Sequence, residues 1–318
     1  MRFGLRLLIG LFALTSMEAA VADEPRAQRI QIEAEPPGNP ELQEIYDVLK
    51  QRQWLEKIQE IFGVFKLPTD ITIRATSCNG ISNAWYARGV VTICYEYLDD
   101  IRKSMPQATT LQGLTPADAV IGQYVYTVSH ELGHALFDVL DIPVLGQPED
   151  AADQFAAYMM LQLDKDQSHR LLAGAAYSYR NYIRNQQVTV PLIAFADAHS
   201  APMQRFYNLL CMAYGADREA FADAVDKGYL PEQRARSCKM EYGEMNFAFQ
   251  KLFVPVIDDE LWKQVMSKKW LPDPDILLFR MTGQGLQESA TPIPQSATPI
   301  PQSATPIPRN AGTTPSQK

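Results

Sequence analysis

The sequence predicts an α+β domain in which a small β-sheet precedes a mostly helical C-terminal half. Two periodicities support this fold class. Apolar side chains recur at helical spacing over residues 42–62, whereas apolar and polar side chains alternate over residues 71–75, as they do in a strand. From about Leu171 to Gly283 the chain reads as further helices separated by prolines and glycines. We expect the domain to cover residues 39–285.

The two ends of the chain differ from this domain. Residues 1–22 combine two arginines, a short apolar run and a small-residue end at Ala22, which is the order of a secretory signal peptide. Residues 23–38 are expected to be a linker. Residues 286–318 contain one Pro-rich heptapeptide written three times, and this composition predicts a disordered, extended tail. The mature protein is therefore expected to be periplasmic or secreted, without a membrane span.

Charge and cysteine content narrow the functional classes. The formal net charge is -8 and no block of lysine or arginine offsets it, which argues against nucleic acid as a partner. Four cysteines in a secreted chain predict disulfides. Because each pair lies within one local segment, we expect Cys78 to pair with Cys94 and Cys211 to pair with Cys238.

The first half of the domain supplies one helix and the sheet. A helix is expected between Asn39 and Gly63, because Asn-Pro is a typical helix start and glycine a typical end. A strand follows from Ile71. Residues 83–98 then predict a hairpin that turns at residues 88–89, which would carry Cys94 back towards Cys78.

A second helix is expected to begin at Thr115 and Pro116 and to run to about Leu140. It is apolar on nearly all sides, which predicts a buried helix. One polar strip interrupts it and contains His130, Glu131, His134 and Asp138. A buried helix with a single polar strip is expected to line a cleft.

The strip has the chemistry of a zinc site. His130 and His134 project from the same side of a helix one turn apart, so both imidazoles can reach one tetrahedral ion. Glu131 is rotated by about 100° from His130, so it can take a proton from a water molecule on the ion. The alternative is two buried histidines satisfied by carbonyl groups, which would carry a large desolvation penalty. We expect one zinc ion per chain.

Three acids near the start of the next helix, at Pro148, are candidates for the third zinc ligand. Glu149 and Asp153 are four residues apart and share a helix face, whereas Asp150 is turned by about 100° towards solvent. The longer Glu149 is expected to reach the metal and Asp153 to orient a ligating histidine. Asp153 is the runner-up as ligand, and Asp138 is a further alternative.

Several segments together resemble a known family. They are "SHELGHALFDVLDIPVLGQPEDAADQFAAYMM", "SNAWY", "CYEYL", "QRFYNLLCMAYG" and "LPEQRARSCKMEY". They resemble a bacterial family of zinc metallopeptidases of unknown function, gluzincin-like in character, over about residues 41–253. The resemblance implies a zincin-like core with a small mixed sheet, an active-site helix and a helical half that carries the third ligand. The gluzincin-like pattern Glu-x-x-Ala-Asp matches Glu149, Ala152 and Asp153, although the gap after His134 is short for that type.

The resemblance also implies a substrate-binding strand. Asn83 and Ala84 are similar to the Asn-Ala edge-strand motif of thermolysin-like enzymes, whose backbone pairs with the substrate. An exposed strand beside the metal would bind an extended peptide by adding a strand to the sheet. The alternative is an ordinary strand that packs Trp85 into the core.

A zincin also needs a donor that stabilises the oxyanion, usually from the second lobe. His199 is the catalytic candidate for this role, with Arg205 and Tyr207 behind it. The alternative is a loop histidine that precedes a helix.

These features predict a secreted or periplasmic zinc-dependent peptidase, a hydrolase in which Glu131 activates water to cleave peptide or protein substrates. The alternative is a non-catalytic zinc-containing binding or scaffolding module of the cell envelope. Glu131 favours catalysis, because a structural metal needs no base beside it. An amidase that acts on a cell-wall peptide is also open, and the sequence does not predict the oligomeric state.

Overall fold

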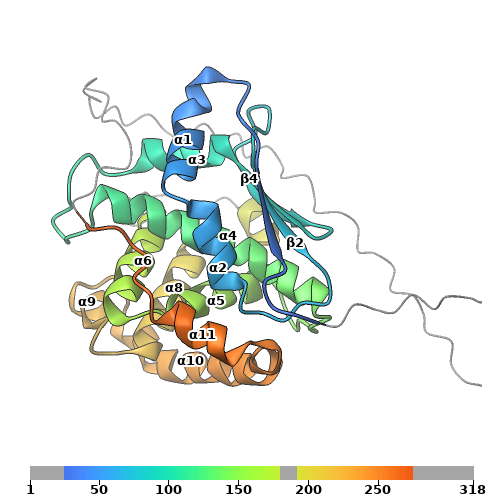
Figure 1. The fold of residues 1–318 in the computed structure, drawn as a ribbon. Coiled ribbons are helices and arrows are strands. Elements are labelled where there is room, and N and C mark those ends of the chain that lie inside the picture. The colour runs from blue at the N-terminus through green and yellow to red at the C-terminus, as the bar shows by residue number, and fades with distance from the viewer. Residues whose placement is uncertain (1–24, 180–191, 275–318) are drawn as a thin grey trace, which may run out of the picture.

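A four-stranded mixed sheet lies against a layer of helices in the computed structural model, which describes residues 25–179 and 192–274 (Figure 1). The strand order is β1-β2-β4-β3. Strands β1 (Ile30–Ala34), β2 (Ile71–Thr76) and β4 (Val90–Cys94) are parallel, and β3 (Ala84–Ala87) is an antiparallel edge strand. The predicted α+β class with a small mixed sheet is confirmed. The predicted signal peptide and repeat tail lie outside the described residues.

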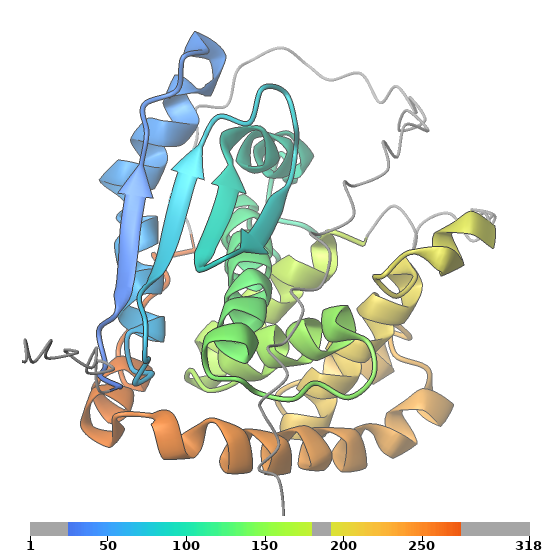
Figure 2. The same cartoon turned by 90° about the vertical axis from the view of Figure 1, so that its right-hand side faces the viewer.

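The helices cover one face of the sheet (Figure 2). Ile71, Ile73 and Ala75 of β2 point into this covered face and are fully buried. Between them Arg74 points to the other face, where it pairs with Glu33 of β1. The alternation follows from the period of two along a strand, and it explains why the pattern of β2 was readable in the sequence.

Strand β1 corrects the prediction that residues 23–38 form a linker. Residues 30–34 instead pair in parallel with β2, in a register that places Ile30 beside Ile71 and Ala34 beside Ala75. Ile30 is buried against the core. The domain therefore begins before residue 39.

The single helix expected between Asn39 and Gly63 is also corrected. A 3-10 turn at Pro40–Leu42 leads into α1 (Gln43–Gln51), and a separate helix α2 spans Trp54–Phe62. Gln53 between them has a φ of 53°, in the left-handed region. This residue breaks the helix, yet the apolar spacing continues across the break, so both helices bury their apolar side chains in one core.

The hairpin and its disulfide are as predicted. Strands β3 and β4 are joined by a two-residue turn in which Arg88 and Gly89 both have positive φ, at 50° and 81°. This is the backbone that a tight hairpin requires. The N–H of Cys94 donates to the carbonyl of Asn83 at 3.1 Å, and Cys94 forms a disulfide with Cys78. Helix α3 (Tyr95–Ser104) starts directly after β4.

Helix α4 (Pro116–Val139) runs through the centre of the domain beneath β3 and β4. It begins as predicted, because the Thr115 hydroxyl accepts from the Asp118 N–H. Helix α6 (Lys165–Tyr177) packs directly on it through Gly174. A Cβ atom on Gly174 would lie 2.0 Å from the carbonyl oxygen of Asp118, so only glycine allows this approach.

The C-terminal half is helical, as predicted, and lies below and beside the sheet in Figure 2. Its remaining elements are α5 (Pro148–Met160), η2 (Leu192–Ala196), α8 (Pro202–Ala216), α9 (Ala222–Asp226), α10 (Glu232–Leu252), η3 (Val254–Val256) and α11 (Asp259–Met266). The predicted disulfide between Cys211 and Cys238 joins α8 to α10. Among the helices of the described segments, none has the length and apolarity needed to cross a membrane.

Candidate metal centre

Three side chains from two helices bring their ligand atoms to one point. Nε2 of His130 lies 3.2 Å from Nε2 of His134 and 3.0 Å from Oε2 of Glu149. The same Glu149 oxygen lies 3.3 Å from Nε2 of His134. These three atoms therefore form a nearly equilateral triangle, and the histidines come from α4 and the glutamate from the first turn of α5.

Small residues allow the two helices to meet here. After α4 the chain turns back through Asp141 and Gly146, which both have positive φ, and α5 then packs along α4. Gly133, between the two histidines, faces Ala152 and the ring of Phe155. A Cβ atom on Gly133 would lie 3.0 Å from that ring, so a larger residue would push α5 and its carboxylates away from the histidines.

Asp153 fixes the orientation of His130. Its Oδ1 lies 2.7 Å from Nδ1 of His130, on the side of the ring that faces away from Glu149. When Nδ1 donates to this carboxylate, Nε2 keeps a free lone pair, which is the tautomer that a metal ligand needs. Arg205 of α8 holds the same carboxylate with two hydrogen bonds of 2.7 Å. Asp153 also lies close to Tyr126 of α4 and contributes, after burial, to raising the pKa of that phenol.

The electrostatics of the site couple the histidines to the acids. Burial opposes protonation of His130, but hydrogen bonds to Asp153 and Glu149 outweigh it and raise the pKa of His130 to about 9. Burial acts to raise the pKa of Glu149, yet hydrogen bonds from His130, His134 and His199 hold that pKa well below its usual range. The carboxylates of Glu149 and Asp153 therefore place negative charge beside the histidines. A bound cation would take the place of the protons that these histidines carry.

Glu131 lies next to the triangle and does not belong to it. Burial raises the pKa of its carboxyl above the usual range, although His130 and His134 act in the opposite direction. The backbone N–H of Tyr86, on edge strand β3, hydrogen-bonds to this carboxylate. Glu131 thus lies between the three candidate ligands and the edge of the sheet.

The predicted substrate strand borders the site. Asn83 immediately precedes β3, and the side-chain oxygen of Asn83 accepts from the Ala84 N–H at 2.9 Å. Ala84 is buried towards α4, whereas Trp85 points to the opposite face and is 37% exposed. The alternative in which Trp85 packs into the core is therefore wrong.

His199 reaches the site from the other side, just before α8. Its Nε2 lies 2.8 Å from Oε2 of Glu149, and its Nδ1 lies 3.1 Å from a carboxylate oxygen of Asp197. The hydrogen bond to Glu149 raises the pKa of His199. At this site, the donor atoms that all lie within 4.8 Å of one another come from His130, His134 and Glu149, without His199. His199 is therefore a neighbour of the triangle that contacts the Glu149 carboxylate and does not belong to the group of three donor atoms.

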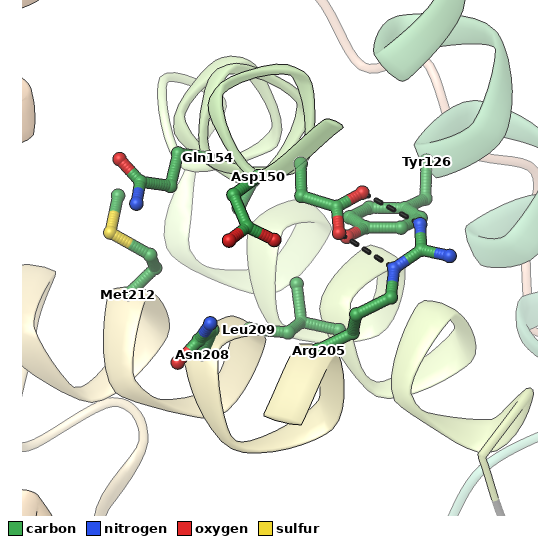
Figure 3. A pocket seen from close by; sticks show the side chains of 9 residues that line it. Tyr126, Asp150, Gln154, Arg205, Asn208, Leu209 and Met212 are labelled. Carbon is green, nitrogen blue, oxygen red and sulfur yellow. Dashed lines mark hydrogen bonds and ion pairs between the residues drawn. The ribbon is translucent and has the colours of Figure 1, made fainter. Parts of the chain in front are cut away.

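Asp150 lies apart from the triangle, but it does not face open solvent as expected. It is half-buried and lines a small pocket between α5 and α8, together with Gln154, Asn208 and Met212 (Figure 3). The difference arises because α8 packs against this face of α5. Arg205 and Tyr126 border the same pocket (Figure 3).

The runner-up ligands have other partners. Asp153 contacts the far nitrogen of His130, and Asp138 accepts a hydrogen bond of 2.5 Å from the Tyr86 hydroxyl. Arg205, expected behind His199, is held by Asp153, and Tyr207 packs against the cluster around the second disulfide. The sequence analysis assigned no role to Tyr86 or Tyr126, because their contacts join elements that are distant in the chain.

The triangle fits a tetrahedral zinc ion. Zinc bonds of about 2.0–2.1 Å to nitrogen and oxygen place neighbouring ligand atoms about 3.3 Å apart in a tetrahedron. The observed separations of 3.0, 3.2 and 3.3 Å agree with this spacing. Two imidazoles and one carboxylate form a donor set that catalytic zinc uses, with a fourth position for water or substrate.

A protein-family model matches most of the domain. The family model DUF4344, described as "Putative metallopeptidase", matches residues 35–253. No curated protein and no solved structure matches the chain. The matched range contains strands β2 to β4 and both disulfides. It also contains His130 and His134 of α4 and the three acids of α5, which are Glu149, Asp150 and Asp153.

Proposed function

The chain belongs to the DUF4344 family, and from this membership we propose that it is a zinc-dependent peptidase that hydrolyses peptide bonds outside the cytoplasm. The observation that carries the proposal is the triangle of His130, His134 and Glu149 with Glu131 beside it. This arrangement combines a candidate metal site of three protein donors with a buried carboxylate that is not one of them.

His130, His134 and Glu149 would hold the ion. When bound, zinc polarises a carbonyl group and lowers the pKa of a water molecule. Asp153 and Arg205 keep the His130 ring in the orientation that binding requires, because the guanidinium fixes both oxygens of the carboxylate.

Glu131 is the proposed general base. Its burial favours the protonated form, so the carboxylate is a better proton acceptor than an exposed glutamate. It takes the proton from the attacking water and can later deliver it to the leaving amine. His199, whose pKa is raised by Glu149, is the proposed donor to the oxyanion that develops on the carbonyl oxygen.

Edge strand β3 is the proposed binding site for the substrate backbone. In an antiparallel ladder only alternate residues face the partner strand. The Cys94-to-Asn83 hydrogen bond makes Asn83, Trp85 and Ala87 the residues that face β4. The carbonyl groups of Ala84 and Tyr86 therefore point to the open edge, beside Glu131, whereas the N–H groups of these two residues already donate to Asn83 and Glu131. An extended peptide could pair with this edge.

The compartment is part of the proposal. Two disulfides are present, and disulfides persist in oxidising compartments such as the periplasm or the exterior. Together with the signal-like residues 1–22, they support secretion or a periplasmic location.

The test is digestion of a peptide library by the zinc-loaded mature protein and by Glu131→Gln. The substitution preserves the shape of the side chain and removes the base, so zinc should remain bound while cleavage is lost. Equal cleavage by both proteins would reject Glu131 as the base. Zinc binding without cleavage of any peptide by the wild type would favour the non-catalytic binding module.

A further inference from the structure

A tyrosine on the edge strand makes contacts that the proposed function does not use. The Tyr86 hydroxyl donates to Oδ2 of Asp138 at 2.5 Å and accepts from the Gly89 N–H at 3.0 Å. Burial, followed by the hydrogen bond to Asp138, raises the pKa of this phenol. The side chain thus links the hairpin turn to the C-terminal end of α4.

The same residue touches the site through its backbone. The Tyr86 N–H hydrogen-bonds to the Glu131 carboxylate. Glu131 and Asp138 are seven residues apart, so they lie on one face of α4, separated by two turns or about 10 Å. Tyr86 therefore contacts α4 at two positions along the helix axis. Its backbone contacts Glu131 near the site, and its hydroxyl contacts Asp138 two turns nearer the C-terminal end of the helix.

We propose that the Tyr86–Asp138 hydrogen bond positions edge strand β3 over Glu131 and so sets the distance between the peptide-binding edge and the metal centre. Tyr86 and Asp138 are positioning residues in this account, because their side chains act through the backbone of β3. The inference rests on the proposed function only for the ligand of the strand, which is taken to be a peptide.

The geometry explains why this strand needs an anchor. β3 has a hydrogen-bonded neighbour on one side only, and it contains four residues. An edge strand of this length gains little stability from its ladder and can move away from the helix beneath it. The pair with Asp138 restrains the strand from outside the sheet, on the side where the backbone of β3 meets Glu131.

The first arm of the test uses metal-free protein and needs no substrate. Hydrogen exchange at the residue 86 amide should accelerate about tenfold in Tyr86→Phe and Asp138→Ala, because both variants lose the hydrogen bond that joins β3 to α4. Tyr86→Phe also loses the bond from the Gly89 N–H, so Asp138→Ala isolates the contact with α4. Asp138→Asn keeps an acceptor oxygen and should preserve most of the protection. The control is Tyr158→Phe, which loses a 2.7 Å hydrogen bond to Asn246 away from the strand and should leave this amide unchanged. Unchanged exchange in both Tyr86→Phe and Asp138→Ala would overturn the proposal.

The second arm uses zinc-loaded protein and two probes, acetohydroxamate and an extended tripeptide hydroxamate. Both can bind the metal, but only the tripeptide can pair with β3. Tyr86→Phe should weaken binding of the tripeptide about tenfold and leave acetohydroxamate and zinc affinity unchanged. Equal weakening of both probes would contradict a role in positioning the strand. If the wild type binds both probes equally, the proposed peptide binding fails, and the exchange arm still decides whether the pair positions β3.

Discussion

Arg205 and Asp153 are joined by two hydrogen bonds of 2.7 Å, although they lie 52 residues apart on different helices. The same carboxylate orients His130 at 2.7 Å. Arg205 is thus connected to the candidate metal centre through a single intermediate side chain, and α8 is part of the site even though it supplies no ligand.

Replacing Arg205 by methionine should lower both the stability of the protein and its affinity for zinc. The Asp153 carboxylate would remain buried without its counter-charge, so the free energy of unfolding should fall by about 3 kcal/mol. Zinc affinity should fall roughly 10–100-fold, because the carboxylate would no longer be fixed against His130. Urea unfolding and zinc titration measure the two effects.

Arg234→Met is the matched control for that variant. Arg234 pairs with Glu241 in the same lobe, and its other hydrogen bonds go to Asn208, Ser237 and the sulfurs of the second disulfide, none of which is a candidate ligand. Its substitution should lower stability, because these hydrogen bonds are lost, and leave zinc affinity unchanged. Equal zinc affinities for the Arg205 and Arg234 variants would refute the role given to Arg205.

The three acids at the start of α5 should differ in their effect on zinc. Glu149→Ala removes a ligand and should weaken zinc binding by more than about 100-fold, whereas Asp153→Ala should lie in the range of about 10–100-fold. Asp150→Ala is the control, because Asp150 is the sequence neighbour of Glu149 and faces α8. Competition titration with a chromophoric chelator gives the order. A larger loss of zinc affinity for Asp153→Ala than for Glu149→Ala would indicate that Asp153 is the ligand and that Glu149 is not.

The close contact between α4 and α6 should be sensitive to a single methyl group. Gly174→Ala places a Cβ atom against the Asp118 carbonyl and should destabilise the protein by about 1–3 kcal/mol. In Gly243→Ala, on α10, the new Cβ meets no atom within 4 Å. That control should be neutral or stabilising by up to about 1 kcal/mol, since alanine favours helix over glycine. Equal thermal shifts for the two variants would contradict the packing.

Stability of the metal-free protein should depend on the charge of His130. Its pKa rises on folding from 6.5 to about 9, so protonation stabilises the folded state. This contribution is complete below about pH 6.5 and is lost as the pH rises through about 9. Urea unfolding with a chelator present should therefore show falling stability across that window, and Asp153→Asn should flatten the curve. Constant or rising wild-type stability from pH 6.5 to 9 would contradict the coupling.

Local signals were sufficient for much of this fold. The Thr-Pro start of α4, the Arg-Gly turn of the hairpin and the period of β2 each depend on neighbours in the chain, and both disulfides join segments close in sequence. The grouping of His130, His134 and Glu149 rests on helix periodicity and one short turn. Helix spacing alone also predicts that the side chains of Asp150 and Glu149 point in different directions.

Features that depend on distant contacts were missed. β1 has only five residues, and its strand character comes from parallel pairing with β2, about 40 residues later. The break at Gln53 carries no glycine or proline to mark it. The partners of Arg205 and of Tyr86 could not be read before the positions of α8 and β3 relative to α4 were known.

The most direct test of the central claim is a zinc-edge anomalous difference map from crystals of the zinc-loaded protein. The account predicts one peak per chain, bonded to Nε2 of His130, Nε2 of His134 and a carboxylate oxygen of Glu149 at about 2.0–2.2 Å, with the fourth position filled by solvent. A peak with four protein ligands, or with Asp153 or Asp138 in place of Glu149, would contradict it.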